Sequence, residues 1–447
     1  MKNEKRLIEL IEKYKKSGPY YTSYPPESRW DTDFSHENYA HILKEFSEKN
    51  EPSTLYVHFP FCPKQCYYCC CRTKVTNNPS KIEEFLDYQS SEINLLQKIL
   101  RDRIKFKEIH LGGGSPSFMS ERDFIRMMQN LSHIVDFKDV EEITMEIDPR
   151  TVDADKMFFY HYRGVNRISF GVQDFNTDVQ KAVNRLQSLE KLEELIVPEI
   201  RKNFKSINFD LIYGLPLQTK DSFKKTIETA KRLSPDRICI YNYDHKPDIN
   251  RHQLMIKPSE LPNINEKMML FVDSIEELTN SGYEFVGIDH FAKPNDELAL
   301  SKKNKTINRN FNGYGTGRTK TIIGVGPSGS GRFLNYYSQN TLATLDYYKI
   351  LENERLPVKK GYTLNIDDMI RRTVIDTIIC THSLDFFEIE KKLGIDFKKY
   401  FKREFNLLNQ FIQEGIIDMN NNSINITPLG RIFIRNVCSV FDKFLKR

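Results

Sequence analysis

Between residues 54 and 242 the sequence alternates short apolar runs with longer amphipathic segments. The runs are rich in Val, Ile, Tyr and Phe and are too short for buried helices, so we expect strands. Strands joined by helical crossovers pair in parallel, and six such units predict a partial (β/α)6 barrel, with an open doubly wound sheet as the alternative. The expected strands are residues 54–59, 107–111, 142–147, 167–172, 207–212 and 237–242, and the expected helices are residues 80–101, 120–132, 152–162, 188–202 and 219–231.

Polar and glycine-rich motifs follow the ends of four expected strands. In a parallel barrel the catalytic groups sit on the loops that follow the carboxyl ends of the strands. We therefore expect a single site at that face of the barrel. The motifs are the cysteine-rich segment 62–71, Gly112-Gly113-Gly114, Asp148-Pro149-Arg150 and Gln173-Asp174.

The whole chain is expected to contain four consecutive segments. They are an N-terminal arm (1–48) that begins with a charged amphipathic helix, the barrel (49–295), connecting loops and short strands that complete the substrate side (296–360), and a small, mostly helical domain (361–447). The last segment resembles a winged helix, but its charges are mixed and we do not expect it to bind nucleic acid. Its expected elements are helices near residues 365–380, 384–393 and 396–414, a hairpin turning at Asn420–Asn422, and a final helix from about residue 428.

Composition favours a cytoplasmic enzyme. No run approaches the roughly 18 apolar residues of a membrane span. The N-terminus lacks the apolar core and the small-residue cleavage site of a signal peptide. The net charge is 66 − 61 = +5, which suits an anionic small substrate and does not require nucleic acid as a partner.

Five of the eight cysteines lie between residues 62 and 71. Because the cytosol keeps thiols reduced, such a group indicates metal binding or redox chemistry and not disulfides. The other three, Cys239, Cys380 and Cys438, stand alone among apolar residues. We expect them to be small buried hydrophobic side chains.

Cys62, Cys66 and Cys69 have the spacing C-x3-C-x2-C. Thiolates favour iron–sulfur clusters and zinc. A four-iron cluster held by three cysteines keeps one iron open, and that iron can chelate the amino and carboxylate groups of S-adenosylmethionine (SAM). We therefore expect a [4Fe–4S] cluster that acts on SAM. The alternative is structural zinc with Cys70 or Cys71 as the fourth ligand, although adjacent cysteines crowd a tetrahedral site.

The glycine triplet and one acidic residue extend this prediction to the cofactor. Bare backbone at Gly112–Gly114 can approach a ligand closely, and the SAM amino group is the natural candidate. Alone, the triplet would be an ordinary tight turn. Glu146 ends the third expected strand, where it can accept hydrogen bonds from ribose hydroxyls. A single strand glutamate is more often simply solvated.

These motifs are part of a longer set, and with that set the chain resembles the oxygen-independent coproporphyrinogen III oxidases, anaerobic enzymes of haem synthesis. The resemblance implies a radical SAM partial barrel, two SAM molecules, and conversion of two coproporphyrinogen III propionates to vinyl groups, which gives protoporphyrinogen IX. An electron donor such as flavodoxin or ferredoxin is implied too, and we expect a monomer. The matching motifs are YTSYP (21–25), YVHFPFC (56–62), GGGSPSF (112–118), EIDPR (146–150), GVQDFN (171–176), VNR (183–185), DLIYGLPLQT (210–219), IDHFA (288–292), RNFNGY (309–314) and RNVC (435–438).

The same resemblance implies roles for individual residues. Cys71 matches a further cysteine that is important for turnover but is not a cluster ligand. His58 matches a family position, although a strand histidine is often a satisfied core residue. Arg185 offers a bidentate donor for a carboxylate. The implied contacts to the first SAM are Tyr56, Gly113, Glu146 and Ser330, and those to the second are Tyr68, Gly114, Ser115, Gln173, Arg185, Asp210 and Asp244.

Four departures from the family pattern affect substrate or second-cofactor positions and leave the cluster untouched. An alternative function is therefore a related radical SAM enzyme for another tetrapyrrole, such as a haem methyltransferase. A haem carrier is disfavoured, because its family lacks the counterparts of Cys71 and the Tyr21–Pro25 arm. Lys15 or Lys16 is the candidate to supply the charge that Tyr20 lacks. The departures are Cys70 for Gly, Tyr20 for Arg, Asp244 for a small residue, and the glycine-rich segment 324–331.

Overall fold

The computed structural model describes residues 2–16, 18–32, 34–100 and 104–445. The chain forms two compact units, and each is assembled from separate stretches of sequence. The sheet unit comprises Asp31–Pro262 and Arg318–Thr363, and the helical unit comprises Met1–Trp30, Asn263–Gly317 and Leu364–Arg447. Because neither unit is continuous in the chain, the two units do not correspond to the four consecutive segments expected from the sequence. The roles given to those four segments stay predictions.

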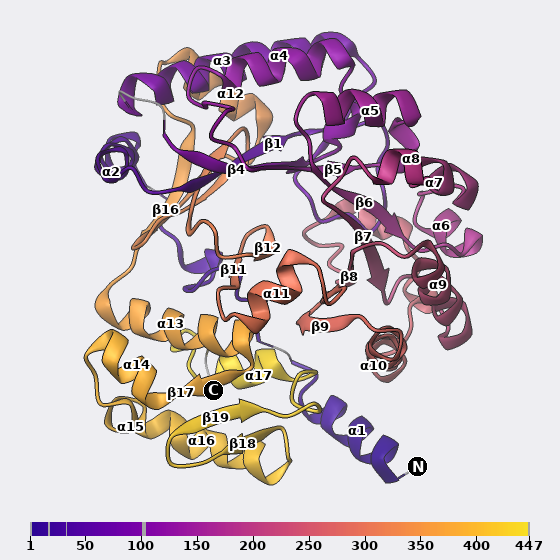
Figure 1. Ribbon diagram of the computed structural model, residues 1–447, viewed down its shortest axis with the longest axis vertical. Helices are drawn as coiled ribbons and strands as arrows, with labels where there is room; N and C mark the ends of the chain where they lie inside the picture. Colours follow the sequence, from indigo (N-terminus) through magenta and orange to yellow (C-terminus); the bar gives the residue numbers. More distant parts are fainter. Residues whose placement is uncertain (1, 17, 33, 101–103, 446–447) are drawn as a thin grey trace. The chain divides into compact units, whose positions relative to one another are not determined.

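Six parallel strands form the main part of the sheet unit, as the sequence predicts. They are β1 Ser53–Phe59, β4 Phe106–Gly113, β5 Glu142–Ile147, β6 Arg167–Gln173, β7 Ser206–Tyr213 and β8 Arg237–Asn242. Strands that are neighbours in the sheet are also successive in the chain. Right-handed crossovers that all step in one direction place their helices on one face, so this sheet is a partial barrel and is not doubly wound. Figure 1 shows these helices along the outer side of the sheet.

The connecting helices agree with the predicted ones except in two places. The predicted helix 188–202 is two helices, because Val197 is extended before Pro198, and proline cannot continue a preceding helix. A short helix at Thr177–Ala182 (α6) was not predicted. Residue 101, the predicted end of the first helix, lies outside the described residues. The other helices are α3 Pro79–Leu100, α4 Glu121–Leu131, α5 Ala154–Tyr162, α7 Leu189–Leu195, α8 Pro198–Arg201 and α9 Lys220–Leu233.

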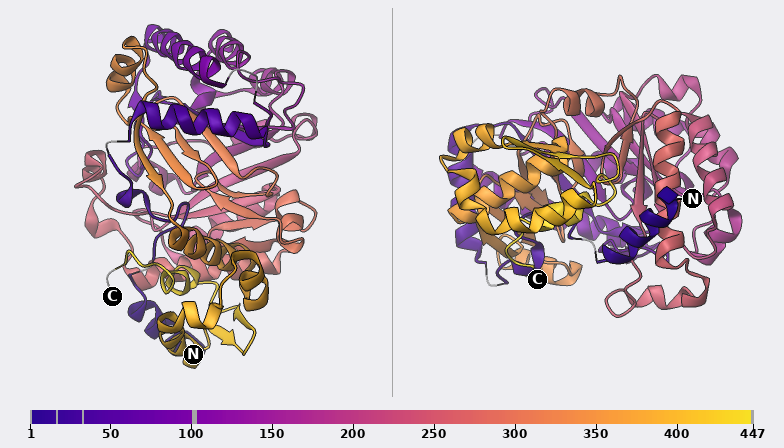
Figure 2. Two further views of the ribbon diagram at one scale, coloured as in Figure 1. Left: turned by 90° about the vertical axis from the view of Figure 1, so that its left-hand side faces the viewer. Right: turned by 90° about the horizontal axis from the view of Figure 1, so that it is seen from below.

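The glycine-rich segment near residue 324 extends the sheet beyond β1. Strand β13 (Thr321–Val325) pairs with β1 in parallel, with Gly324 opposite Tyr56. Antiparallel strands β14 Ser330–Arg332, β15 Tyr336–Asn340 and β16 Val358–Thr363 follow, with helix α12 Thr344–Glu352 between the last two. Helix α2 (His36–Lys49) lies across these strands (left view of Figure 2), where Tyr39 and Phe46 pack edge-on against Phe333.

The core of the sheet unit consists of strand side chains that are buried on both faces of the sheet. Phe170 and Phe209, on neighbouring strands, are fully buried and pack edge to face, with their ring centroids 6.2 Å apart. Burial of such a side chain stabilises the fold by about 2–3 kcal/mol. The rigid strands that result carry the loops at their carboxyl ends.

The helical unit contains the two termini of the chain. Its C-terminal part has the winged-helix order of helix, strand, helices and hairpin, with the three strands arranged β17-β19-β18. The predicted helix 396–414 is divided in two. The final helix begins at Ile434 and not near residue 428. The preceding residues form turns, in which Gly430 approaches the Ile416 carbonyl so closely that no Cβ would fit. The elements are α1 Lys2–Lys13, α10 Ile264–Asn280, β9 Glu284–Gly287, β10 His290–Ala292, α11 Glu297–Lys303, β11 Asn308–Asn310, β12 Gly313–Gly315, α13 Ile366–Thr381, β17 Ser383–Asp385, α14 Phe386–Leu393, α15 Phe397–Tyr400, α16 Lys402–Gln413, β18 Ile417–Met419, β19 Ser423–Ile426 and α17 Ile434–Ser439.

Within the described part of the chain, every helix is too short or too polar to cross a membrane. The isolated cysteines Cys239, Cys380 and Cys438 are buried, as predicted.

Candidate functional site

A cavity of about 480 Å³ lies in the sheet unit, on the loops that follow the barrel strands. It brings together thirteen of the sixteen residues that the sequence singles out. Tyr56, His58 and Ser330 are the three that do not line it. The thirteen are Cys62, Cys66, Tyr68, Cys69, Cys71, Gly113, Gly114, Ser115, Glu146, Gln173, Arg185, Asp210 and Asp244.

The cysteine loop forms one wall of this cavity. A short parallel pairing between Phe61–Cys62 (β2) and Lys74–Val75 (β3) closes the base of the loop. Cys62 Sγ lies 3.6 Å from the Ser115 hydroxyl, and burial raises the pKa of its thiol to about 11. Hydrogen bonding from Cys71 lowers the pKa of the Cys69 thiol; the Cys71 amide lies 3.4 Å from its sulfur.

The arrangement of these thiols fits a cluster better than a single ion. In the residues that the structure describes, no three Cys, His, Asp or Glu side chains are grouped to ligate one metal ion. Structural zinc needs four ligands at about 2.0–2.3 Å around one point. A four-iron cluster instead takes each cysteine on a separate iron, so three thiols spread along one wall suit it.

Two arginines point at the Cys66 sulfur. Arg185 Nη1 lies 3.5 Å and Arg150 Nη2 lies 3.7 Å from Cys66 Sγ. Cationic donors favour the thiolate, which is the form that ligates metal. The cluster expected from the sequence therefore has a suitable set of residues here.

Asp148 balances these two arginines, and the sequence did not single it out as a site residue. Its Oδ2 lies 2.7 Å from Arg150 Nη2 and 3.4 Å from Arg185 Nη1. Burial alone would raise the pKa of Asp148, but Arg185 and Arg150 outweigh burial and lower it. The position of Asp148-Pro149-Arg150 directly after a strand was the available signal for this role.

Glu146 is held by a second residue that the sequence missed, His110. His110 Nε2 lies 3.1 Å from Glu146 Oε1, and the Gly113 amide donates to Oε2 at 3.3 Å. A Cβ at Gly112 would stand 2.7 Å from Glu146 Oε1, so the carboxylate packs directly on bare backbone. The glycine triplet thus brings the strand β4 backbone close to Glu146.

His58 lies behind the cavity wall with both ring nitrogens occupied. Nε2 is 3.1 Å from the Arg72 carbonyl, to which it donates, and Nδ1 accepts from the Tyr56 hydroxyl at 3.0 Å. Burial lowers the pKa of His58, which favours the neutral ring. His58 therefore ties the segment after Cys71 to strand β1.

The opposite wall carries two of the remaining acidic residues. Asp210 accepts hydrogen bonds from Ser169 at 2.6 Å and Asn208 at 2.8 Å. Asp244 pairs with Lys246 at 2.5 Å. The negative charge that distinguishes Asp244 from the family pattern is thus compensated locally.

Tyr20, another departure from the family, lies in the helical unit. The Arg435 guanidinium is 3.8 Å from the centre of its ring, and Arg309 donates to its carbonyl at 3.1 Å. Lys15 is paired with Glu12 at 3.8 Å. Arg435, from the RNVC motif, is therefore a cation in contact with Tyr20. That Lys15 or Lys16 supplies the charge which Tyr20 lacks stays a prediction.

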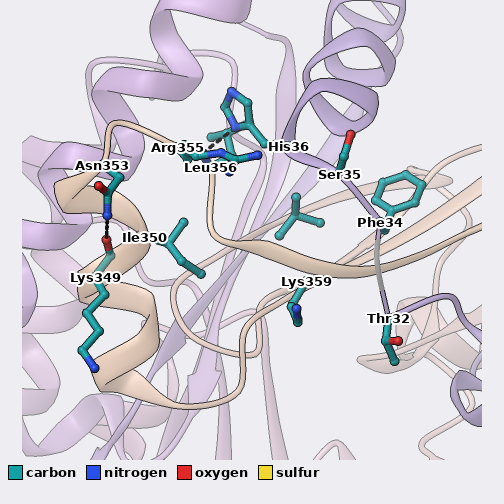
Figure 3. A pocket seen from close by; sticks show the side chains of 11 residues that line it. Thr32, Phe34, Ser35, His36, Lys349, Ile350, Asn353, Arg355, Leu356 and Lys359 are labelled. Atoms are coloured by element: carbon teal, nitrogen blue, oxygen red, sulfur yellow. Dashed lines mark hydrogen bonds between the residues drawn. The ribbon is translucent and has the colours of Figure 1, made fainter.

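A second cavity of the sheet unit, of about 600 Å³, contains none of the predicted site residues (Figure 3). It lies between the start of α2 and the loop that follows α12. The Leu356 amide donates to His36 Nδ1 at 2.7 Å on one side, and Asn353 caps the Lys349 carbonyl at 2.6 Å on the other. Its lining mixes apolar and basic side chains.

Comparison with known proteins gives the family. Residues 56–230 match the model of the radical SAM superfamily, and residues 364–433 match the HemN C-terminal domain. The oxygen-independent coproporphyrinogen III oxidase of Escherichia coli is 38% identical over 440 residues, which are 98% of this chain and 96% of that protein. This chain belongs to the oxygen-independent coproporphyrinogen III oxidases. Enzymes of the same name from Pseudomonas aeruginosa and Helicobacter pylori are 37% and 35% identical to this chain. Each alignment covers 98% of this chain, and they cover 95% and 97% of the respective relatives.

The fold of this oxidase family member agrees with that of a solved relative. The E. coli coproporphyrinogen III oxidase structure, described as a radical SAM enzyme, has a TM-score of 0.90 and 37% identity, covering 95% of this chain and 98% of that one. Membership of the radical SAM superfamily implies a [4Fe–4S] cluster and SAM as cofactors.

Proposed function

We propose that this protein oxidatively decarboxylates two propionate side chains of coproporphyrinogen III to vinyl groups, which gives protoporphyrinogen IX in anaerobic haem synthesis. The main observation that supports this proposal is the cavity, which is lined by residues of the cysteine loop and the glycine triplet together with Glu146 and Arg185. It occurs in a chain that is 38% identical to curated oxidases of this name over 98% of its length.

Cys62, Cys66 and Cys69 are the proposed ligands of the cluster. Bound cluster and SAM together supply a radical that removes hydrogen from an unactivated carbon. The protein's own part is to hold the thiolates, and Arg150 and Arg185 stabilise the one at Cys66 through their donors. Asp148 keeps the local charge near neutral.

The first SAM is assigned to the side of the cavity lined by the ends of strands β4 and β5, next to β1 in the sheet. Glu146 accepts from the ribose hydroxyls, while the His110 ring and the Gly113 amide orient its carboxylate. Tyr56 and Ser330 complete this set. Both lie outside the cavity lining.

A second SAM is assigned to the other side, and an orphaned donor supports it. Arg185 is buried, and its Nε has no hydrogen-bond partner within the described residues. A buried guanidinium nitrogen without a partner favours an anionic ligand such as the SAM carboxylate. The other residues of this set are Tyr68, Gly114, Ser115, Gln173, Asp210 and Asp244.

Two further residues are proposed to serve turnover. Cys71 lines the cavity, where its thiol can reach the substrate without ligating the cluster. His58 was predicted to be catalytic as well. Its two hydrogen bonds favour a positioning role behind Tyr56.

The remaining expectations are a reduced flavodoxin or ferredoxin as electron donor, a monomeric state and a cytoplasmic location. We assign the arm (1–48) and the segment 296–360 to the substrate side. We do not expect the C-terminal domain (361–447) to bind nucleic acid.

The test is the substrate dependence of SAM cleavage. Under anaerobic reducing conditions, coproporphyrinogen III should stimulate formation of 5′-deoxyadenosine, and haem should not. Stimulation by haem with methyl transfer would establish the alternative enzyme class. Tight haem binding without any SAM cleavage would establish a carrier.

A further inference from the structure

Glu92 is a buried carboxylate in the middle of helix α3, with 2% of its surface exposed. Three donors converge on it. The Gly326 amide and the Tyr347 hydroxyl reach Oε2 at 2.8 and 2.7 Å, and Asn340 Nδ2 reaches Oε1 at 2.8 Å. A buried carboxylate is costly, so a set of partners that matches it this fully points to a specific task.

Glu92 anchors the turn between β13 and β14 by accepting the hydrogen bond of the Gly326 amide, and this contact suggests its role. Asn340 Nδ2 donates a second hydrogen bond to the Gly326 carbonyl at 2.9 Å. Both the amide and the carbonyl of Gly326 are therefore held by hydrogen bonds. The Ser328 amide donates to the Thr341 carbonyl at 2.8 Å. The turn is therefore anchored to helix α3 and to the end of strand β15.

The same turn packs tightly on the end of strand β1. Gly326 has φ +90°, and a Cβ there would stand 2.4 Å from the His58 carbonyl. Gly324 lies opposite Tyr56 in the parallel register, and its Cβ would stand 2.5 Å from the Ser330 amide. Displacement of the turn would thus move Ser330 and relax the support of Tyr56 and His58.

The partners of Glu92 require an acceptor at each of its two oxygens. A glutamine here would present an NH2 group either to Asn340 Nδ2 or to the Gly326 amide, which can only donate. Rotation of the Asn340 amide would cure the first conflict but would set its oxygen against the Gly326 carbonyl. Only a group with two accepting oxygens satisfies all three donors.

We propose that Glu92 is a positioning residue for the cofactor, which fixes the Gly324–Ser330 turn against the end of β1 and so sets the first SAM side of the cavity. This inference rests on the proposed function, which assigns Tyr56 and Ser330 to SAM. Glu92 touches neither SAM nor substrate. It acts through Gly326, directly at the amide and through Asn340 at the carbonyl.

The experiment compares anaerobically reconstituted wild-type protein with Glu92→Gln and a matched control, Gln89→Leu. Gln89 is fully buried on the same helix but contacts Asn130 and not the turn. We measure iron content, thermal unfolding and the SAM dissociation constant at about pH 8.5, where Glu92, whose pKa is about 7, is ionised. Glu92→Gln should keep the cluster and weaken SAM binding about tenfold, because a charged acceptor of several bonds is lost. Gln89→Leu should leave SAM binding unchanged.

A second variant keeps the test decisive if Glu92→Gln does not fold. Tyr347→Phe removes one donor and keeps the buried ring, so it should weaken SAM binding about two- to threefold and leave iron content intact. SAM affinity equal to wild type in the folded variants would overturn the inference. A wild-type protein that holds a cluster but binds no SAM would instead overturn the proposed function, and this inference with it.

Discussion

At the scale of single residues, the site combines groups that local sequence shows with groups that only the fold brings near. The C-x3-C-x2-C spacing is local, and so the sequence alone could nominate Cys62, Cys66 and Cys69, which the structure places in one cavity. Asp148 sat in a noted motif, but its bridge to Arg185 joins positions 37 residues apart. The role of Glu92 depends on Gly326, 234 residues away, which no periodicity in helix α3 could indicate.

The cysteines provide the first prediction. Cys62→Ala, Cys66→Ala and Cys69→Ala should each abolish the cluster, whereas wild type should carry about four irons after anaerobic reconstitution. Cys71→Ser should keep the iron and SAM cleavage but lose turnover of the tetrapyrrole. Iron analysis and the visible charge-transfer absorption measure this. Loss of iron in Cys71→Ser as complete as in Cys69→Ser would show that the ligands are wrongly assigned.

Glu92 also predicts a dependence of stability on pH. Burial raises its pKa from 4.5 to about 7. The folded state therefore binds a proton that the unfolded state has already released, and stability falls as pH rises from about 5 to 7. Tyr347 and Tyr39, the titratable groups that face it in the described part of the chain, stay neutral because burial raises their pKa.

The pH effect of Glu92 is measured by urea unfolding against Glu92→Gln. Relative to that variant, wild type should lose up to about 3 kcal/mol of unfolding free energy across this window. A difference between the two proteins that does not change with pH would mean that Glu92 is ionised throughout.

At the scale of elements, the β/α alternation was readable because each strand and helix carries its own apolar pattern. The β13–β14 turn was visible only as a glycine-rich segment. Strand β13 pairs with β1, which is far from it in the sequence, and Gly326 is needed for close approach to the His58 carbonyl. No local sequence pattern indicates either contact. Helix ends were missed where Pro198 or Gly430 interrupts an apolar repeat.

Two glycines with nearly the same φ test the packing of this turn. Gly326 has φ +90° with the His58 carbonyl 2.4 Å from a Cβ position, while Gly282 has φ +88° with nothing within 4 Å. Gly282→Ala should cost only the backbone strain of about 1–2 kcal/mol. Gly326→Ala should cost about 3 kcal/mol or more, because a clash with backbone is added. Equal losses of unfolding free energy would show that the turn is free to move.

The contact of Tyr20 with Arg435 belongs to the helical unit. Tyr20→Arg should place two guanidinium groups together and remove a cation–π contact, lowering stability by about 1–2 kcal/mol. Tyr20→Phe keeps the ring and should change little. Thermal unfolding of the two variants measures this. A Tyr20→Arg protein as stable as wild type would show that the contact between Arg435 and the Tyr20 ring does not contribute to stability.

At the scale of the whole molecule, the family was predictable from the sequence, and the composition of the two units was not. The motif set runs from Tyr21 to Cys438, so the relationship extends over the whole chain. The compact units, however, are made from separate stretches, because β13–β16 return to the sheet after a long excursion. A linear sequence pattern does not carry that information.

The central claim is the reaction, and the identity of the tetrapyrrole product tests it most directly. Reconstituted protein with SAM, a low-potential reductant and carboxyl-labelled coproporphyrinogen III should release labelled CO2 and form protoporphyrinogen IX, identified by mass after oxidation. Cys71→Ser, with its cluster intact, should release none. Recovery of unchanged coproporphyrinogen by wild-type protein that cleaves SAM, or a methylated tetrapyrrole as the product, would contradict the account.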